Sequence, residues 1–224
     1  MAASSDAAAV PQPVRPFILV LAGVNGAGKS SVGGALLAEH GLTWFNPDTF
    51  ARELVAQLGL TPEDANGRAW KHGRDQLEAA IAQGKSHAFE TTLGANTIPA
   101  MLAAASATHD VVMIFCGLSS PEQHMARVRA RVARGGHDIP EKKIHERWVA
   151  SRANLIQLLP TLARLQVFDN SAEAPLGGDI EDPVLVLEMA GGALVFPQPD
   201  DLAALAATPG WARPIVQAAI ELQA

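Results

Sequence analysis

The chain has 224 residues, of which 48% are apolar and 18% are charged, with a formal charge of −6 at pH 7 and one cysteine. This size supports one sizeable core, the acidic balance argues against general nucleic-acid binding, and the lone cysteine excludes an intramolecular disulfide or a cysteine-based metal cluster. No apolar run approaches the roughly 18–20 residues that span a bilayer, so we expect no membrane partner and a cytoplasmic location.

Short apolar runs alternate with helical patterns in the first half of the chain. Residues 1–15 are rich in Ala, Ser, Pro and Gln and lack the apolar centre of a signal peptide, so we expect a disordered leader before one domain over 16–224. The apolar runs predict strands over 17–21, 43–46, 87–89 and 110–116. The patterns and caps between them predict helices over 29–39, 48–58, 61–83 and 98–107.

The second half continues this alternation and then changes character. A basic helix beginning at Ser120 is expected to stop near Gly135, and a second helix to run from Pro140 to about 158. A fifth strand is expected over 166–168. Within residues 183–224 the pattern predicts a β-hairpin and two helical segments, over 184–188, 193–196, 200–206 and 210–222.

The alternation of strands and helices predicts a three-layer α/β fold with a mainly parallel five-stranded sheet and a C-terminal β-hairpin. Ligands of such sheets bind at the carboxyl ends of the strands. Four polar residues follow directly after predicted strands: Asn25, Asp48, Glu90 and Asp169. We therefore expect these four residues to converge on one crevice.

Gly23 to Ser30 match the pattern G-x-x-x-x-G-K-[S/T] between a predicted strand and a predicted helix. The glycines let backbone N–H groups point at phosphate oxygens, Lys29 is suited to the β- and γ-phosphates, and the Ser30 hydroxyl is suited to Mg²⁺. We expect ATP and Mg²⁺ as cofactors; a glycine-rich turn without a ligand is the alternative. The predicted nucleotide-binding residues are Gly23, Asn25, Gly26, Ala27, Gly28, Lys29, Ser30 and Ser31.

A P-loop identifies nucleotide binding but does not identify the reaction. Kinases, GTPases and mechanical ATPases all use it. The chain contains neither the Asn-Lys-x-Asp guanine reader of GTPases nor the Leu-Ser-Gly-Gly-Gln signature of ABC ATPases. Together with the small size, these two absences favour a kinase.

Two carboxylates at predicted strand ends are candidates for chemistry. Asp48 begins a helix, where it could accept the proton of an acceptor hydroxyl during phosphoryl transfer. An ordinary role in complementing the helix dipole fits its position equally well. Glu90 could ligate Mg²⁺ through water or hydrogen-bond the hydroxyls of the acceptor, and a cap for the following helix is the alternative.

Eight of the 17 Lys and Arg residues fall between Arg127 and Arg152. By their spacing, Arg127, Arg131 and Arg134 share one face of the expected helix, and a pair of glycines directly after it is a candidate hinge. We expect a lid over about 121–158 that closes over ATP and delivers an arginine to the transferred phosphoryl group. A solvated helix face is one alternative; a nucleic-acid groove is another, weakened by the acidic total and the lack of interleaved aromatic residues.

The remaining polar residues give weaker indications. Residues 169–171, Asp-Asn-Ser after the last parallel strand, are candidates for the far wall of an adenine pocket or for a simple Asx-turn. The histidines have neither the spacing nor the cysteine partners of a metal site, and His137 could contact phosphate or cap a helix. Ser30 therefore remains the candidate metal ligand.

Taken in this order, the segments resemble the zeta toxin family, and within it the small proteins labelled predicted ABC-type ATPases. The resemblance covers about residues 16–197 and rests on Gly-Val-Asn-Gly-Ala-Gly-Lys-Ser-Ser (23–31), Asn-Pro-Asp-Thr-Phe (46–50), Phe-Glu-Thr-Thr-Leu (89–93), Arg-Gly-Gly-His-Asp-Ile-Pro (134–140) and Val-Phe-Asp-Asn-Ser (167–171). It implies a P-loop kinase fold and ATP- and Mg²⁺-dependent phosphorylation of a sugar hydroxyl. The best-known acceptor class of the family is UDP-N-acetylglucosamine.

The resemblance also implies roles for individual residues. The implied catalytic residues are Lys29, Asp48, Arg134 and Arg152, the implied acceptor-binding residues are Glu90 and Thr92, and the implied metal ligand is Ser30. Arg131 competes with the other two arginines, because the spacing in the basic segment differs from that of the well-known toxins. The sugar-nucleotide-binding insertions of the larger toxins are not evident, since Leu93 leads quickly into the next helix. The acceptor is therefore open between UDP-N-acetylglucosamine, another phosphorylated metabolite and a small antibiotic-like molecule.

The leading hypothesis is an ATP- and Mg²⁺-dependent kinase that transfers the γ-phosphoryl group to a hydroxyl of a small metabolite. The alternative from a different class is an ATP-dependent switch or partner-binding ATPase without a small-molecule acceptor, in which the lid reports the nucleotide state. A nucleic-acid kinase ranks third, and no nucleic-acid partner is expected. The family resemblance adds an antitoxin protein as a partner, although no antitoxin-binding element can be read from the chain.

Overall fold

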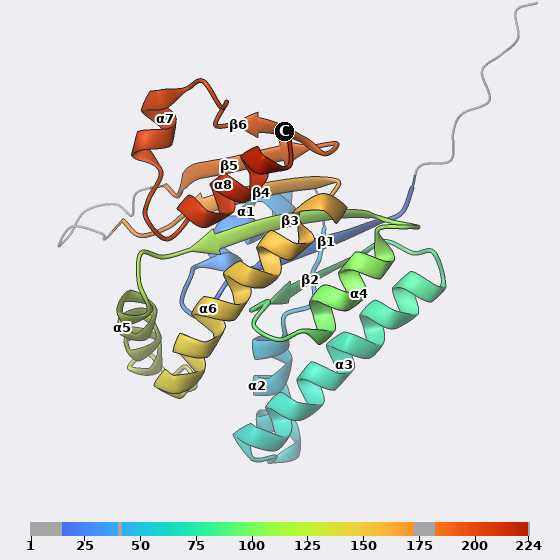
Figure 1. The fold of residues 1–224 in the computed structure, drawn as a ribbon. Coiled ribbons are helices and arrows are strands. Elements are labelled where there is room, and N and C mark those ends of the chain that lie inside the picture. Colours follow the sequence, from blue (N-terminus) through green and yellow to red (C-terminus); the bar gives the residue numbers. More distant parts are fainter. Residues whose placement is uncertain (1–14, 40–41, 173–181, 224) are drawn as a thin grey trace, which may run out of the picture.

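The computed structural model describes residues 15–39, 42–172 and 182–223, which build one six-stranded sheet with helices on both faces (Figure 1). The strands are β1 Phe17–Ala22, β2 His87–Thr91, β3 Asp110–Gly117, β4 Arg164–Asp169, β5 Val184–Ala190 and β6 Ala193–Phe196. The helices are α1 Lys29–Glu39, α2 Pro47–Leu58, α3 Pro62–Ala82, α4 Thr97–Ala105, α5 Pro121–Val132, α6 Glu141–Leu158, the short 3-10 helix η1 Leu159–Thr161, α7 Leu202–Ala207 and α8 Arg213–Glu221. The predicted leader, apart from Arg15, lies outside the described residues.

The sheet has a parallel part and an antiparallel part. Its strand order is β2-β1-β3-β4-β5-β6. Strands β2, β1, β3 and β4 are parallel to one another, and helical crossovers connect them as parallel pairing requires. The C-terminal hairpin of β5 and β6 continues the same sheet in antiparallel pairing beyond β4. The predicted α/β class is confirmed, with four parallel strands in place of the expected five and with the hairpin joined to the same sheet.

The predicted strand over 43–46 was wrong. Only Phe45 forms a bridge, to Phe89 of β2. The next residue, Asn46, already caps α2 by accepting hydrogen bonds from the backbone N–H groups of Asp48 and Thr49. Pro47 then opens the helix and has no N–H to contribute to a ladder. The helix start therefore follows so closely that no strand can propagate.

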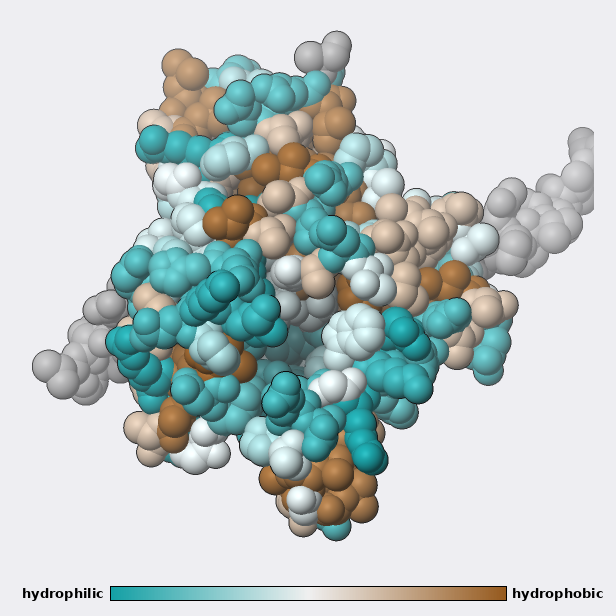
Figure 2. Space-filling model, turned by 60° about the horizontal axis from the view of Figure 1, so that its bottom comes forward, coloured by the Kyte–Doolittle hydropathy of each residue, from teal (hydrophilic) through white to brown (hydrophobic). Residues whose placement is uncertain are grey.

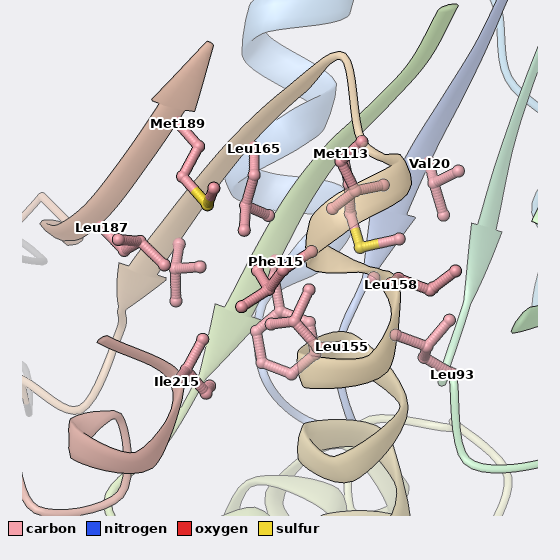
Figure 3. Close-up of a cluster of buried hydrophobic side chains, with 14 of the residues drawn as sticks. Val20, Leu93, Met113, Phe115, Leu155, Leu158, Leu165, Leu187, Met189 and Ile215 are labelled. Carbon is pink, nitrogen blue, oxygen red and sulfur yellow. The ribbon is translucent and has the colours of Figure 1, made fainter. Parts of the chain in front are cut away.

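The alternating side chains of β1 divide the interior into two layers. Ile18 and Val20 belong to the larger cluster, which also takes side chains from α3, α4, α6 and α8, all on the near face of the sheet in Figure 1. Leu19 and Leu21 point to the opposite face, where Leu37 of α1 covers them. Figure 3 shows part of the larger cluster, including side chains of β3, β4, β5 and α6. The observed architecture is therefore the predicted three layers.

Two helical pairs border the carboxyl ends of the parallel strands. Helix α2 packs on α3 through small apolar side chains, and α5 packs on α6 through a separate cluster that includes Val24 of the β1–α1 turn. In Figure 1 both pairs project beyond the sheet on the same side. Within the described ranges, no helix combines the length and apolar character needed to cross a bilayer.

Leu155 of α6 provides a test of the larger core. Its side chain is fully buried, so we expect Leu155→Ala to lower the free energy of unfolding by about 2–5 kcal/mol in urea denaturation. The matched control is Val149→Ala on the same helix, where the side chain is 61% exposed and the change should stay within about 0.5 kcal/mol. Equal effects of the two substitutions would contradict this assignment of the core.

Candidate active site

The turn between β1 and α1 forms a cradle of backbone groups. Gly23, Gly26 and Gly28 have positive φ angles of 137°, 84° and 85°, a conformation that favours glycine. Gly23 also lies against β3, because a Cβ atom there would come within 2.2 Å of the Cys116 carbonyl oxygen. Asn170 supports the turn from the end of β4, since its Nδ2 donates to the Ala27 carbonyl oxygen at 2.9 Å. Helix α1 follows at once and directs its N-terminus at the cradle.

A cleft of about 990 Å³ opens at this cradle. Its lining comes from the P-loop, the start of α2, the end of β2, α5 and the segment after β4. The side of the molecule that carries α2 and α5 comes forward in Figure 2, where the surface is hollowed near its centre and mostly hydrophilic around the hollow. The polar and charged residues of the lining are Asn25, Lys29, Ser30, Ser31, Asn46, Asp48, Arg52, Glu90, Gln123, Arg127, Arg131, Arg134, His137, Asn170 and Asp182.

Glu90 is the centre of a buried polar cluster at the floor of the cleft. Its carboxylate lies 3.3 Å from Lys29 Nζ, and both side chains are less than a tenth exposed. It also accepts hydrogen bonds from Ser30 Oγ at 2.8 Å and from Asn46 Nδ2 at 2.9 Å. The predicted alternative of a helix cap is not observed, because Asn46 and Asn96 occupy the N-cap positions of α2 and α4. Glu90 therefore belongs to the P-loop end of the cleft.

Asp48 lies in the first turn of α2 and faces the basic segment. Its Oδ2 is 3.5 Å from Arg131 Nη1, and its Oδ1 is 3.9 Å from His137 Nε2. The Asp48 side chain is about one-third exposed, so it can be reached from the cleft. Burial lowers the pKa of His137, and the Asp48 carboxylate opposes this shift. The carboxylate thus has a cationic neighbour without being sealed from solvent.

The arginines of α5 divide between two sides of the helix as their spacing predicts. Arg127, Arg131 and Arg134 line the cleft, whereas Arg129 pairs with Glu141 at the surface. Arg127 donates to the Asn170 carbonyl oxygen at 2.7 Å and so links α5 to the end of β4. One face of α5 therefore gives the cleft a row of positive charge.

A family model described as an AAA domain matches residues 18–155, more than half of the chain. The chain belongs to this AAA domain family. The matched range runs from β1 to α6 and so includes the P-loop, Asp48, Glu90 and the arginines of α5. Comparison with curated protein sequences gives no match.

Several solved structures share the fold of this AAA domain. The AvrRxo1-ORF1:AvrRxo1-ORF2 structure with sulphate ions has a TM-score of 0.60 at 18% identity, over 80% of this chain and 60% of that one. Its counterpart with ATP has a TM-score of 0.60 at 17% identity, with the same coverage. The PezAT chromosomal toxin–antitoxin system of Streptococcus pneumoniae has a TM-score of 0.51 at 15% identity, over 70% of this chain and 68% of that one.

At these identities the similarity establishes an α/β P-loop kinase-like fold and nothing finer. The predicted fold class is therefore confirmed. That the chain is a protein of zeta-toxin type, one kind of P-loop kinase, stays a proposal. The chain spans about 60% of the length of the AvrRxo1-ORF1:AvrRxo1-ORF2 chains that it matches.

Beyond the P-loop, three residues predicted for the site lie outside the lining of the cleft: Thr92, Arg152 and Asp169. Arg152 stacks on the Trp148 ring, 3.4 Å from its centroid, and donates to the Trp211 carbonyl oxygen at 3.3 Å. Asp169, expected in the common crevice, instead accepts a hydrogen bond from Trp211 Nε1 at 3.0 Å. Thr92 is half-buried after the end of β2. The expected convergence thus holds for Asn25, Asp48 and Glu90 and is wrong for Asp169.

Two residues that hold Asn25 of the P-loop did not stand out in the sequence. Arg147 of α6 donates from Nη1 to Asn25 Oδ1 at 2.6 Å. Burial lowers the pKa of Arg147, and the Asp48 carboxylate opposes that shift. His124 of α5 is fully buried and donates from Nδ1 to the Asn25 carbonyl oxygen at 2.9 Å. Arg147 was only one of eight basic residues in its segment, and a lone histidine in a helix carries no signal.

His124 should make the stability of the AAA domain depend on pH. Burial lowers its pKa from 6.5 to about 4, and Lys29 and Arg127 add to this shift while the Asn25 carbonyl opposes it. The unfolded chain therefore binds the proton first as the pH falls. The stabilisation is fully present above pH 6.5 and is lost towards pH 4, by about 1.4 kcal/mol for each pH unit inside that window.

Urea unfolding of the wild-type protein and of His124→Gln between pH 7 and pH 4.5 measures this effect. The difference in unfolding free energy between them should shrink as the pH falls. The other histidines titrate in both proteins and cancel in the comparison. Parallel profiles would show that His124 is not the group responsible.

Proposed function

We propose that the chain is an ATP- and Mg²⁺-dependent kinase of zeta-toxin type that phosphorylates a hydroxyl of a small molecule. The observation that carries the proposal is that a carboxylate reachable from solvent, Asp48, shares one cleft with the P-loop and stands beside Arg131. Nucleotide binding would need only the P-loop. Transfer to a hydroxyl acceptor also needs a group that takes the proton of that hydroxyl as the phosphoryl group is transferred. Asp48, a carboxylate additional to Glu90, can fill this role.

The P-loop end of the cleft would hold the phosphates of ATP. Backbone N–H groups of the cradle and the N-terminus of α1 favour anions, and Lys29 would bind the β- and γ-phosphates. The oxygens of Ser30 and Glu90 are the hard donors that Mg²⁺ prefers, and Mg²⁺ commonly takes few protein ligands beside phosphate and water. These residues fit the metal, which when bound would neutralise charge on the β- and γ-phosphates.

In the proposed reaction the acceptor hydroxyl attacks the γ-phosphorus and Asp48 takes its proton. The new O–P bond forms as the bond from the γ-phosphorus to the β–γ bridging oxygen breaks, and ADP leaves. Arginines of the basic segment would stabilise the charge on the transferred group. Arg131 and Arg134 line the cleft and Arg147 reaches the P-loop, which supports them over Arg152.

The acceptor site is proposed at the end of β2, beside the cleft, with Thr92 as the binding residue that the resemblance implies, although its side chain is not part of the cleft lining. Glu90 is a candidate for the same role by resemblance, but its contacts with Lys29 and Ser30 support a place beside the metal. The acceptor class implied by the resemblance is a nucleotide sugar such as UDP-N-acetylglucosamine. A protein partner of antitoxin type is part of the proposal, because PezAT is a toxin–antitoxin system.

Asp48→Asn should lower the rate of phosphoryl transfer by about 10²–10⁴-fold, the usual contribution of a positioned base, while ATP affinity stays nearly unchanged. The measurement uses γ-labelled ATP with a metabolite panel that includes nucleotide sugars, followed by mass spectrometry of the products. Glu53→Gln, an exposed carboxylate on the same helix, is the control and should keep full activity. Full turnover by Asp48→Asn would refute the base assignment. Hydrolysis of ATP without any labelled small molecule would favour the nucleotide-dependent switch.

Glu90→Gln separates the two roles proposed for that residue. If Glu90 supports the metal, the Mg²⁺ concentration needed for half-maximal activity should rise by roughly tenfold or more, as for other residues that orient metal ligands, while the KM for the acceptor stays the same. A titration of activity against Mg²⁺ and against acceptor gives both values. A raised acceptor KM with an unchanged Mg²⁺ requirement would place Glu90 at the acceptor instead.

A further inference from the structure

The turn after β2 contains a backbone conformation that the proposed chemistry does not explain. Leu93 has a φ of 54°, and among the described residues it alone combines a positive φ with a side chain. This region is unfavourable for residues other than glycine, and such residues gather at functional sites. Leu93 is also fully buried, in the same cluster as Leu155 and Leu158 of α6 (Figure 3). Its surroundings must therefore hold it in place.

Asn154 of α6 holds this turn. Its Nδ2 donates to the Leu93 carbonyl oxygen at 2.8 Å and to the Ala95 carbonyl oxygen at 3.3 Å. The residue is only 6% exposed, so water is poorly placed to replace it. A helical hydrogen bond to the Ala95 carbonyl would come from the N–H of the residue four positions later, but that residue is Pro99, which has no N–H. The buried Leu93 carbonyl thus depends on this one amide, which also contacts the carbonyl of the exposed Ala95.

The same face of α6 reaches the P-loop. Arg147 precedes Asn154 by seven residues, which places both on one side of the helix. A Cβ atom at Gly94 would lie 2.6 Å from Arg147 Cγ, so the backbone of the turn lies directly on that side chain. Arg147 in turn donates to Asn25. Helix α6 therefore contacts both the turn after β2 and the phosphate cradle, which follow two paired strands of the sheet.

We propose that Asn154 is a positioning residue that fixes the backbone of residues 92–95 and so places Thr92 relative to the P-loop. The inference rests on the proposed kinase function. Glu90 is held independently by Lys29, Ser30 and Asn46, so it keeps its place when Asn154 changes. Thr92 has no side-chain hydrogen bond within the described part of the chain, and its position follows the backbone of the turn. The Asn154 side chain hydrogen-bonds to the turn, and Arg147 makes the contact of α6 with the P-loop, so we expect Asn154 to act on acceptor binding far more than on ATP binding.

Asn154→Asp tests this in the full chain. A carboxylate of the same size cannot donate to the two carbonyl oxygens and is repelled by them. The kcat/KM for the panel member that the wild-type protein phosphorylates fastest should fall by about tenfold to a hundredfold, as expected for a misplaced site, with the ATP dissociation constant unchanged within about twofold. Amide hydrogen exchange should quicken at residues 92–95 and stay unchanged at 24–30.

Two further variants separate positioning from general stability. Ser151 lies on the same helix, and its buried hydroxyl has no hydrogen-bond partner in the described part of the chain. Ser151→Ala should therefore leave every readout at the wild-type value. Asn154→Gln keeps an amide donor and should restore part of the acceptor kcat/KM.

The inference is overturned if Asn154→Asp leaves the acceptor kcat/KM unchanged, or weakens ATP binding as much as acceptor use. It is also overturned if Asn154→Gln restores nothing. A wild-type protein that phosphorylates no member of the panel would overturn the proposed function itself, and this inference with it.

Discussion

A buried ion pair between Lys29 and Glu90 joins the P-loop to the end of β2, and the rest of the cleft is arranged around it. Removing water from two charges is expensive, and taking away one partner of such a pair typically costs about 3–5 kcal/mol. The hydrogen bonds from Ser30 and Asn46 satisfy the remaining carboxylate oxygen. They bring the start of α1, the cap of α2 and the end of β2 to one point. The cluster therefore fixes the floor of the cleft before any phosphate arrives.

Packing limits how much of the basic segment can move over that floor. Val24 of the P-loop shares a buried cluster with Val128 of α5 and Ile144 of α6. A lid that moved as one body over 121–158 would have to break this cluster and pull Arg147 from Asn25. Within the link over 133–140, Gly135 has a positive φ and no neighbour within 4 Å of a Cβ atom, whereas Ile139 packs against the same cluster. The lid over about 121–158 therefore stays a prediction, and this packing favours movement of the link over movement of the whole segment.

The sequence predicted the features that depend on local chemistry. The P-loop could be predicted because its glycines, lysine and hydroxyl are all needed within the turn itself and lie close together in the sequence. The sequence predicted correctly that Glu90 lies at the end of β2. It did not predict the contact of Glu90 with Asn46, because residues 43–46 resemble a strand. Asp169 was misplaced because its partner, Trp211, comes from a segment 42 residues later. No local pattern contains such a contact.

The sequence spacing could not show which arginine of helix α6, Arg147 or Arg152, lies near the P-loop. Its existence and length follow from the pattern, but the direction of each face depends on what packs around it. Arg147 and Asn154 share the face that meets the P-loop and the turn after β2. Arg152 lies five residues beyond Arg147, on another face that the Trp148 ring and the C-terminal segment occupy. One helix thus binds the phosphate cradle and the proposed acceptor turn on one side and the end of the chain on another, so a shift of α6 would be felt at all three.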